Sequence, residues 1–241
     1  MSRVAILAAL PGELKPLVQG WTHSHRDGVD LWRWKFDQGE WVAACAGMGA
    51  ERATRAFAAA EQDGPLDLVI SAGWVGALTG AVAAGQTADV SGVIDARTGE
   101  RFRVAAWTGE RWLVTVPYVA GTEEKRRLAA TYGADLVDME AASVARLAAM
   151  RGIPFHAIRG VSDGVDDCLP DFNAFRGAKG EFKLARFIIY ATLRPKYWPS
   201  LMRMGDNSRK AAKAMACAIL DFLDERGYIR RRNGYPGIDP A

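Results

Sequence analysis

The sequence predicts an α/β fold with three α/β/α layers, in which helices flank a mixed, largely parallel central sheet. Short apolar segments alternate along the chain with segments of helical length, as expected for strands joined by crossover helices. The first apolar run, "RVAILAAL" at 3–10, is continuous, which is typical of a strand buried on both faces. With 241 residues, 49% of them hydrophobic, the chain suffices for one large domain, which we place at 1–228.

Three more strands and one helix are predicted in the first half of the chain. "LWRWKF" (31–36) and "WVAACAG" (41–47) are two strands joined by a polar turn. The alanine-rich segment 49–64 predicts a helix that stops before a proline. "LDLVISAGWVGAL" (66–78) predicts a strand that runs into a glycine-containing turn.

The second half continues the alternation. "GERFRVAAW" and "RWLVTVPYV", between residues 99 and 119, predict a half-exposed pair of strands. We expect a helix from about Thr122, a brief strand at 134–137, a helix within "DMEAASVARLAAM" and a strand at 154–162.

The last third, from 176 to 228, is predicted to be helical and basic, followed by a flexible tail at 229–241. Between residues 176 and 213 there are ten Lys or Arg against two Asp or Glu, with aromatic residues among them. One interpretation is peripheral contact of 186–203 with anionic lipid headgroups. The other is a core-packing helix with a solvated basic face, or a subunit interface.

Composition narrows the class of protein. The apolar run at the N-terminus is too short for a membrane span and is interrupted at Pro11, so a buried strand is favoured over a signal peptide. Cys45, Cys168 and Cys217 form no metal-type cluster with the three histidines, which predicts a reduced, cytoplasmic protein without structural zinc. No nucleic-acid recognition motif is present, and nucleic acid is not an expected partner.

Acids and glycine turns follow several predicted strands. Ligands of open α/β sheets bind beyond the carboxyl ends of the strands, so these residues are expected to share one edge. Each also has a simpler interpretation, because glycines serve tight turns and acids cap or favour helix starts. The residues are Glu13, the turns at 47–49 and 73–76, Asp138, Glu140 and Asp163.

These motifs resemble the purine nucleoside phosphorylase and nucleosidase superfamily over roughly residues 3–165, especially its 5'-methylthioadenosine/S-adenosylhomocysteine nucleosidase branch. The matching segments are "VAILAALPGEL", "AGMGAERA", "DLVISAGWVGAL" with "GQTADVS", and the longest, "VDMEAASVARLAAMRGIPFHAIRGVSD". Within the superfamily, the compact middle and the basic C-terminus resemble most the hopanoid-associated phosphorylases. That subgroup implies adenosylhopane as the nucleoside.

The resemblance implies a role for residues at the base end of a substrate. Asp163 would donate a proton to N7 of the purine or share one with it, which makes the base a better leaving group. Ser162 would orient Asp163. From its position alone, rather than from the resemblance, Tyr118 is the expected aromatic wall against the base.

At the sugar end, Glu140 would accept hydrogen bonds from the ribose hydroxyls and favour the developing cation. Met139 would pack under the sugar, and Gly73 would border the substrate. Glu13 would take a proton from water. The resemblance thus implies release of a purine, most directly adenine, from a 5'-substituted nucleoside, without metal or organic cofactor.

Hydrolysis is favoured over phosphorolysis. Trp74 stands where the superfamily usually has a small residue near the nucleophile. The arginines with which phosphorylases of the superfamily bind phosphate cannot be matched to residues of this sequence. Lys15 and Arg52 lie near the relevant turns but are equally consistent with solvated side chains. The alternatives are a phosphate-dependent phosphorylase and a non-catalytic nucleoside-binding sensor. Members of the superfamily are commonly dimers or larger homo-oligomers, which the resemblance implies here as well.

Overall fold

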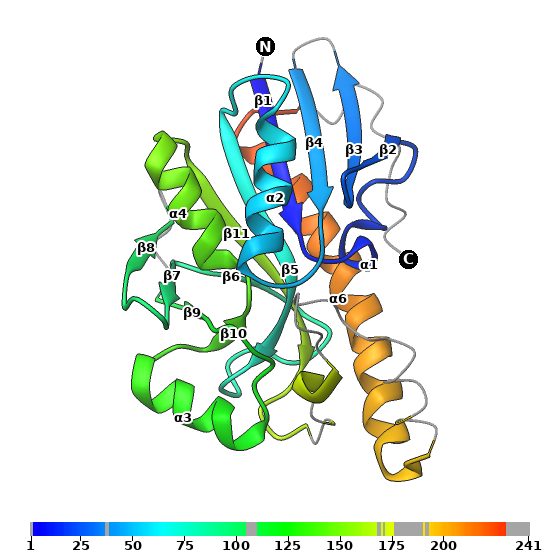
Figure 1. The fold of residues 1–241 in the computed structure, drawn as a ribbon, viewed down its shortest axis with the longest axis vertical. Helices are drawn as coiled ribbons and strands as arrows, with labels where there is room; N and C mark the ends of the chain where they lie inside the picture. Colours follow the sequence, from blue (N-terminus) through cyan, green and yellow to red (C-terminus); the bar gives the residue numbers. More distant parts are fainter. Residues whose placement is uncertain are drawn as a thin grey trace.

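The structure is a computed structural model that describes residues 2–36, 39–104, 110–167, 170, 172–175, 190 and 193–229. Its strands form one mixed sheet with helices on both faces, which confirms the predicted fold class (Figure 1). The expected basic segment at 176–189, the tail from 230 onwards and Cys168 lie outside the described residues.

The strands are β1 (Ser2–Ala8), β2 (Thr22–Arg26), β3 (Val29–Phe36), β4 (Gly39–Cys45), β5 (Leu68–Ala77), β6 (Thr87–Asp89), β7 (Gly92–Asp95), β8 (Arg101–Arg103), β9 (Trp112–Thr115), β10 (Leu136–Asp138) and β11 (Phe155–Asp163). The helices are α1 (Pro11–Leu14), α2 (Ala50–Glu61), α3 (Thr122–Tyr132), α4 (Ala141–Arg151) and α6 (Trp198–Glu225), with 3-10 turns η1 (Phe172–Phe175) and η2 (Pro195–Tyr197).

The sheet follows the order β2-β3-β4-β1-β5-β10-β9-β7-β8, with β11 and then β6 branching from β5. Half of the described pairings are parallel, so the expectation of a largely parallel sheet is wrong in degree. Three of the five antiparallel pairings belong to β2–β3–β4 at one margin and β7–β8 at the other, where successive strands can be joined without a crossover.

Two strand predictions need correction. The exposed edge strand β2, "THSHR", has no apolar alternation and was not expected. The predicted pairing of the two segments between 99 and 119 is wrong, because β8 and β9 both pair with β7, which lies between them. Gly92 permits this arrangement, since a Cβ there would stand 2.4 Å from the Trp112 ring.

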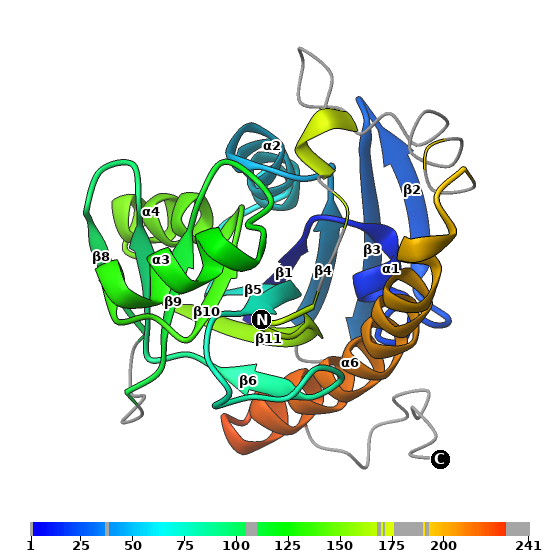
Figure 2. The same cartoon turned by 90° about the horizontal axis from the view of Figure 1, so that it is seen from below.

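Helices cover the two faces of the sheet as separate layers (Figure 2). On one face, α2 and α4 bury small apolar residues and Phe57. On the other, α1 and the second half of α6 pack on the sheet through Leu14, Met215, Ile219 and Leu223. The latter three recur at helical spacing, so this half of the basic C-terminal region is a core helix. None of the described helices is long and apolar enough to cross a membrane.

The long strand β5 creates the opening in which the site lies. Along one edge, its first half pairs with β1, and its end at Gly76 and Ala77 pairs with β10. Its other edge pairs with β11 throughout. The first edge has no recorded partner between Ser71 and Gly76, where β1 and β10 diverge. The carboxyl ends of β1, β5, β10 and β11 therefore surround one space.

Candidate active site

A cavity of about 300 Å³ occupies this space. Its walls come from the turn after β1, the second half of β5, the β10–α4 junction, the end of β11, and helices α3 and α6. Most of its lining is apolar, with a few acidic groups. The lining residues are Ala9, Leu10, Glu13, Met48, Trp74, Val75, Gly76, Tyr118, Val119, Ala120, Lys125, Val137, Asp138, Met139, Glu140, Ser162, Asp163, Met204 and Ser208.

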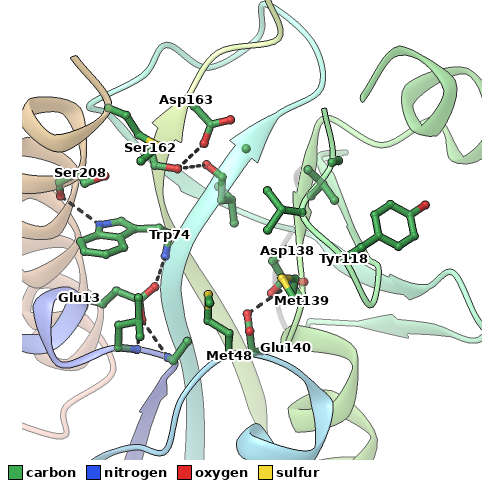
Figure 3. A pocket seen from close by; sticks show the side chains of 18 of the residues that line it. Glu13, Met48, Trp74, Tyr118, Asp138, Met139, Glu140, Ser162, Asp163 and Ser208 are labelled. Atoms are coloured by element: carbon green, nitrogen blue, oxygen red, sulfur yellow. Dashed lines mark hydrogen bonds between the residues drawn. The ribbon is translucent and has the colours of Figure 1, made fainter. Parts of the chain in front are cut away.

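The acids lie at two ends of the cavity (Figure 3). Glu13 and Glu140 are at one end, and Asp163 with Ser162 is at the other. Of the residues predicted from the sequence, the structure brings together Glu13, Tyr118, Met139, Glu140, Ser162 and Asp163. Gly73, Lys15 and Arg52 are not among the lining residues, and Lys15 is exposed at the C-terminal end of α1.

Glu13 is held by backbone donors. Its Oε2 accepts hydrogen bonds from the amides of Ala9 and Leu10 at 2.8 and 2.7 Å, and its Oε1 accepts one from Trp74 at 2.8 Å. A carboxylate offers about four lone-pair sites, so Oε1 keeps one for a further donor such as water. Burial raises the pKa of Glu13, although the three amides and Arg159 act in the opposite direction.

A buried arginine lies beneath this end of the cavity. Arg159, on β11, forms an ion pair with Asp138 at 3.0 Å and donates to the Ser71 hydroxyl at 2.7 Å. A Cβ on Gly73 would stand 3.1 Å from both the Arg159 guanidinium and Glu13 Oε1. Gly73 therefore makes room for the charged groups rather than bordering the substrate space.

Asp138 has a structural part in this network. Its Oδ1 accepts from the Thr115 hydroxyl at 2.6 Å, and its Oδ2 accepts from the Ala141 amide at 2.9 Å, at the start of α4. With Arg159 as its ion partner, its side chain is fully buried. Asp138 thus fulfils the simpler interpretation, a helix-start carboxylate, and Glu140 is the acid that faces the cavity.

Glu140 accepts a hydrogen bond from the Gly49 amide at 2.6 Å, which links the glycine turn after β4 to the cavity. Burial and the charge of Asp138 raise the pKa of Glu140 to about 8. A carboxyl group of this kind gains or loses its proton near neutrality. Its Oε2 accepts a hydrogen bond from the Met139 amide at 3.3 Å, and the side chain lies at the same end of the cavity as Glu13 (Figure 3).

Exchanging Glu140 for glutamine is expected to stabilise the protein at alkaline pH. The pKa of this carboxyl group is near 4.5 in the unfolded chain and about 8 in the folded protein. The folded state therefore holds the proton more tightly, and the free energy of unfolding is highest below pH 4.5 and decreases as pH rises from 4.5 to 8. Glutamine removes that loss. At pH 8 we expect Glu140→Gln to raise Tm by about 2–4 °C, roughly 1 kcal/mol for a chain of this size.

The measurement is thermal unfolding of both proteins at pH 5 and pH 8. The gain should shrink at pH 5, where the wild-type carboxyl is protonated in the folded state. Glu123→Gln, at an exposed acid in the first turn of α3, is the matched control and should show no such pH-dependent gain. A Tm difference that is equal at both pH values would contradict the raised pKa.

At the opposite end of the cavity, Asp163 is bound on both carboxylate oxygens. The Ser162 hydroxyl donates to Oδ1 at 2.5 Å, and the ammonium of Lys125 forms an ion pair with Oδ2. Lys125 also donates to the Gly164 carbonyl at 2.5 Å, and its side chain is 2% exposed. The hydrogen bond from Ser162 is the contact that its predicted orienting role requires, whereas the contact of Lys125 with Asp163 was not predicted.

Trp74 closes the cavity against α6. Its indole nitrogen donates to the Ser208 carbonyl at 3.0 Å, and the ring lies 3.0 Å from where a Cβ on Gly12 would be. The ring therefore forms a wall of the cavity beside Glu13 (Figure 3). Ser208 and Met204 extend this wall from α6.

Tyr118 lines the cavity, but its hydroxyl points away from it and donates to Glu124 (Figure 3). Burial and the neighbouring carboxylate raise the pKa of the Tyr118 hydroxyl. Only its ring is therefore available to a ligand. Met139 and Met48 provide further apolar surface between the acidic ends.

Known proteins share this fold. Residues 100–187 match the sequence profile described as "Phosphorylase superfamily". No curated protein matches the chain.

Three solved structures illustrate the likeness. One is a Helicobacter pylori 5'-methylthioadenosine nucleosidase variant with 5'-methylthioadenosine in its active site (TM-score 0.71, 15% identity, 93% of this chain and 99% of that chain). Another is Helicobacter pylori futalosine hydrolase (0.70, 16%, 93% and 98%), and a third is Arabidopsis thaliana 5'-methylthioadenosine nucleosidase (0.69, 18%, 94% and 98%). The predicted resemblance to the purine nucleoside phosphorylase and nucleosidase superfamily is thus confirmed: the chain has the fold of these nucleosidases, and its residues 100–187 carry the phosphorylase superfamily pattern.

Proposed function

We propose that this protein is a purine nucleosidase that hydrolyses the N-glycosidic bond of a 5'-substituted adenosine and releases adenine. The observation that carries the proposal is the placement of Glu13, Glu140 and Asp163 at two ends of one cavity. Cleavage builds positive charge on the ribose and negative charge on the base. Acids at both ends match these two needs.

The proposed roles follow from the partners of each acid. Glu13, with one acceptor site left, takes a proton from the water that attacks the anomeric carbon. Glu140 accepts hydrogen bonds from the ribose hydroxyls, and Met139 packs against the sugar. Asp163, oriented by Ser162, binds N7 of the purine, with the Tyr118 ring at the rim. The solved structures named above come from nucleosidases, which supports the same substrate class.

Hydrolysis is supported over phosphorolysis by the charges around the cavity. A phosphate would need cations, and among the described lining residues the one cationic side chain is Lys125, which is already paired with Asp163. The indole of Trp74 also fills space beside Glu13. A phosphorylase would need an anion site that these residues do not offer.

The deciding experiment is adenine release from 5'-methylthioadenosine, with and without inorganic phosphate. We expect release without phosphate and no acceleration when phosphate is added. Release that requires phosphate would replace the nucleosidase by the phosphorylase. Tight binding of the nucleoside without any cleavage would favour the non-catalytic sensor, although a binding protein has no need for a water-activating carboxylate.

The 5' substituent is proposed to be long and apolar, as in adenosylhopane. Met204 and Ser208 of α6 line the cavity, and the same helix begins two turns earlier at Trp198. Three of the four large apolar side chains that are exposed in the described part of the chain, Leu193, Trp198 and Met202, lie in 193–202. Arg194 and Arg203 are exposed among them. A lipid-linked nucleoside could reach the cavity from such a surface.

We expect this surface to bind anionic bilayers. The full chain should co-sediment with vesicles containing phosphatidylglycerol more than with phosphatidylcholine vesicles, because arginines add electrostatic attraction to apolar insertion. A variant carrying Leu193→Ser and Met202→Ser should bind at least about threefold less. Met150→Ser, at an equally exposed methionine on α4, is the matched control. Equal binding of the wild type, the double variant and Met150→Ser would contradict membrane contact and leave α6 with a packing role alone.

A further inference from the structure

We propose that Lys125 is a positioning residue that supplies, through Asp163, the proton that leaves with the purine. The inference rests on the proposed function and deepens it. Asp163 alone is the acid in the sequence-based prediction. In the structure the ammonium of Lys125 lies on Oδ2 of Asp163, so in this ion pair the transferable proton is on the lysine.

The position of Lys125 has no explanation in helix stability. It lies in the first turns of α3, where the helix dipole disfavours a positive charge. Its neighbours Arg126 and Arg127 are exposed and reach solvent, whereas the Lys125 side chain is 2% exposed. Burying an ion pair seldom gains net stability, because both charges lose their hydration. A functional reason for the pair is therefore favoured.

The strand β5 makes room for the pair with a glycine. A Cβ on Gly76 would stand 3.1 Å from Lys125 Cε and 3.2 Å from Asp163 Oδ2. Both distances are tighter than ordinary contacts. Gly76 has no left-handed backbone conformation, so the missing side chain, rather than backbone freedom, is what the site requires here.

The geometry also directs the proton. Of the three ammonium protons, one is donated to Asp163 and one to the Gly164 carbonyl. Oδ1 of Asp163 is held by the Ser162 hydroxyl, so Oδ2 is the oxygen that can take up the lysine proton and donate it to N7 of the base. Asp163 lies at the end of the cavity away from Glu13 and Glu140 (Figure 3), and Lys125, which also lines the cavity, is beside it through their ion pair.

The step balances as follows. The bond between the anomeric carbon and N9 breaks, and its electron pair moves onto the purine. A proton passes from Lys125 Nζ to Asp163 Oδ2 and from the carboxyl group to N7, which leaves a neutral amine and a neutral base. Water adds to the anomeric carbon and gives its proton to Glu13. Solvent then returns a proton to Lys125 and removes one from Glu13.

The test compares leaving groups that do and do not need a proton. In 4-nitrophenyl β-ribofuranoside the leaving group departs as a stable anion, whereas adenine requires protonation. We expect Lys125→Met to lower kcat for 5'-methylthioadenosine by about 100-fold or more, the usual size of an acid contribution, with KM within about threefold. Cleavage of the nitrophenyl riboside should fall by less than about fivefold.

Lys125→Arg separates proton supply from charge. Arginine keeps the positive charge but does not release a proton. We expect it to retain the fold and the nitrophenyl activity while remaining impaired on 5'-methylthioadenosine. Arg126 is the next residue of the same helix and forms an exposed ion pair with Asp166. Arg126→Met removes that cation and should leave the cleavage rates of both substrates unchanged.

Other outcomes would overturn the inference. If the Lys125 variants lose activity on both substrates to the same extent, the lysine has only a structural role. If Lys125→Arg restores cleavage of 5'-methylthioadenosine, charge suffices and no proton is supplied. Should the wild-type protein cleave no purine nucleoside, the proposed function fails and the inference fails with it. Cleavage by the wild type with unimpaired Lys125 variants would refute the inference alone.

Discussion

Replacing Asp163 with asparagine is expected to lower adenine release by about two to four orders of magnitude, the range usual for an acid that acts in the transition state. Asparagine nearly matches the shape of the side chain and can still accept from Ser162. It cannot take up a proton and pass it to N7. The expected loss is therefore in kcat, with a smaller change in KM, measured with 5'-methylthioadenosine at saturation.

The same substitution leaves Lys125 buried without its counter-ion. Removing one partner of a buried pair costs about 3–5 kcal/mol, so Asp163→Asn should also lower Tm. Assays should be run well below the Tm of the variant, and the double variant Lys125→Met with Asp163→Asn should recover part of the stability but not the activity. Asp166→Asn, at the exposed acid paired with Arg126, is the control. Turnover near the wild-type rate in Asp163→Asn would refute the assignment.

Periodicity and turn chemistry predict the elements that hold the site. Apolar runs, continuous in β1 and interrupted by Arg159 in β11, mark β1, β5 and β11 because these strands are buried on both faces, and that signal does not depend on the tertiary fold. The short strand β7 and the polar edge strand β2 escaped prediction. Four residues are too few for a period, and β2 has no buried face to impose one.

The acids of the site follow from one rule about strand ends. Glu13, Glu140 and Asp163 each come within three residues of the end of a predicted strand, so their convergence could be expected from the sequence. The resemblance already assigns the ribose to Glu140, but the sequence does not reveal that the Asp138 carboxylate is held in structural contacts. Those contacts come from Arg159 and Thr115, which hold Asp138 from two other strands.

The two buried cations differ in how visible they are. Arg159 interrupts the apolar strand "FHAIRGVS", and a charge in such a run is a signal that could have been used. Lys125 stands in "TEEKRRLAA", a charged helix start like many solvated ones. Only its contact with Asp163 and its place beside Gly76, at the ends of β11 and β5, distinguish it from Arg126. No local pattern carries that information.

Glu13→Gln is expected to abolish water attack while sparing substrate binding. A glutamine amide must place its NH2 group against either the Ala9 and Leu10 amides or the Trp74 amide, so at least one backbone hydrogen bond is lost. It also cannot accept a proton from water. We expect kcat for adenine release without phosphate to fall by about 100-fold or more, as for other general bases.

The pH dependence separates the two effects. Burial raises the pKa of Glu13, and the base must be ionised, so wild-type kcat should fall as pH decreases through that raised value. The residual activity of Glu13→Gln should lack the part of the acidic limb that belongs to Glu13, because glutamine does not titrate, whereas the ionisation of Glu140 near pH 8 remains in both proteins. Binding of a non-cleavable 5'-alkylthio adenosine analogue, measured by calorimetry, should stay within about threefold if only the base is lost.

Glu51→Gln provides the matched control, since Glu51 also lies in the first turn of its helix but is exposed. It should leave both the rate and the acidic limb unchanged. If Glu13→Gln keeps the rate and the acidic limb of the wild type, water is activated by another group. If it loses hydrolysis but gains turnover when phosphate is added, the cavity accepts an external nucleophile, and Glu13 alone makes this fold a hydrolase.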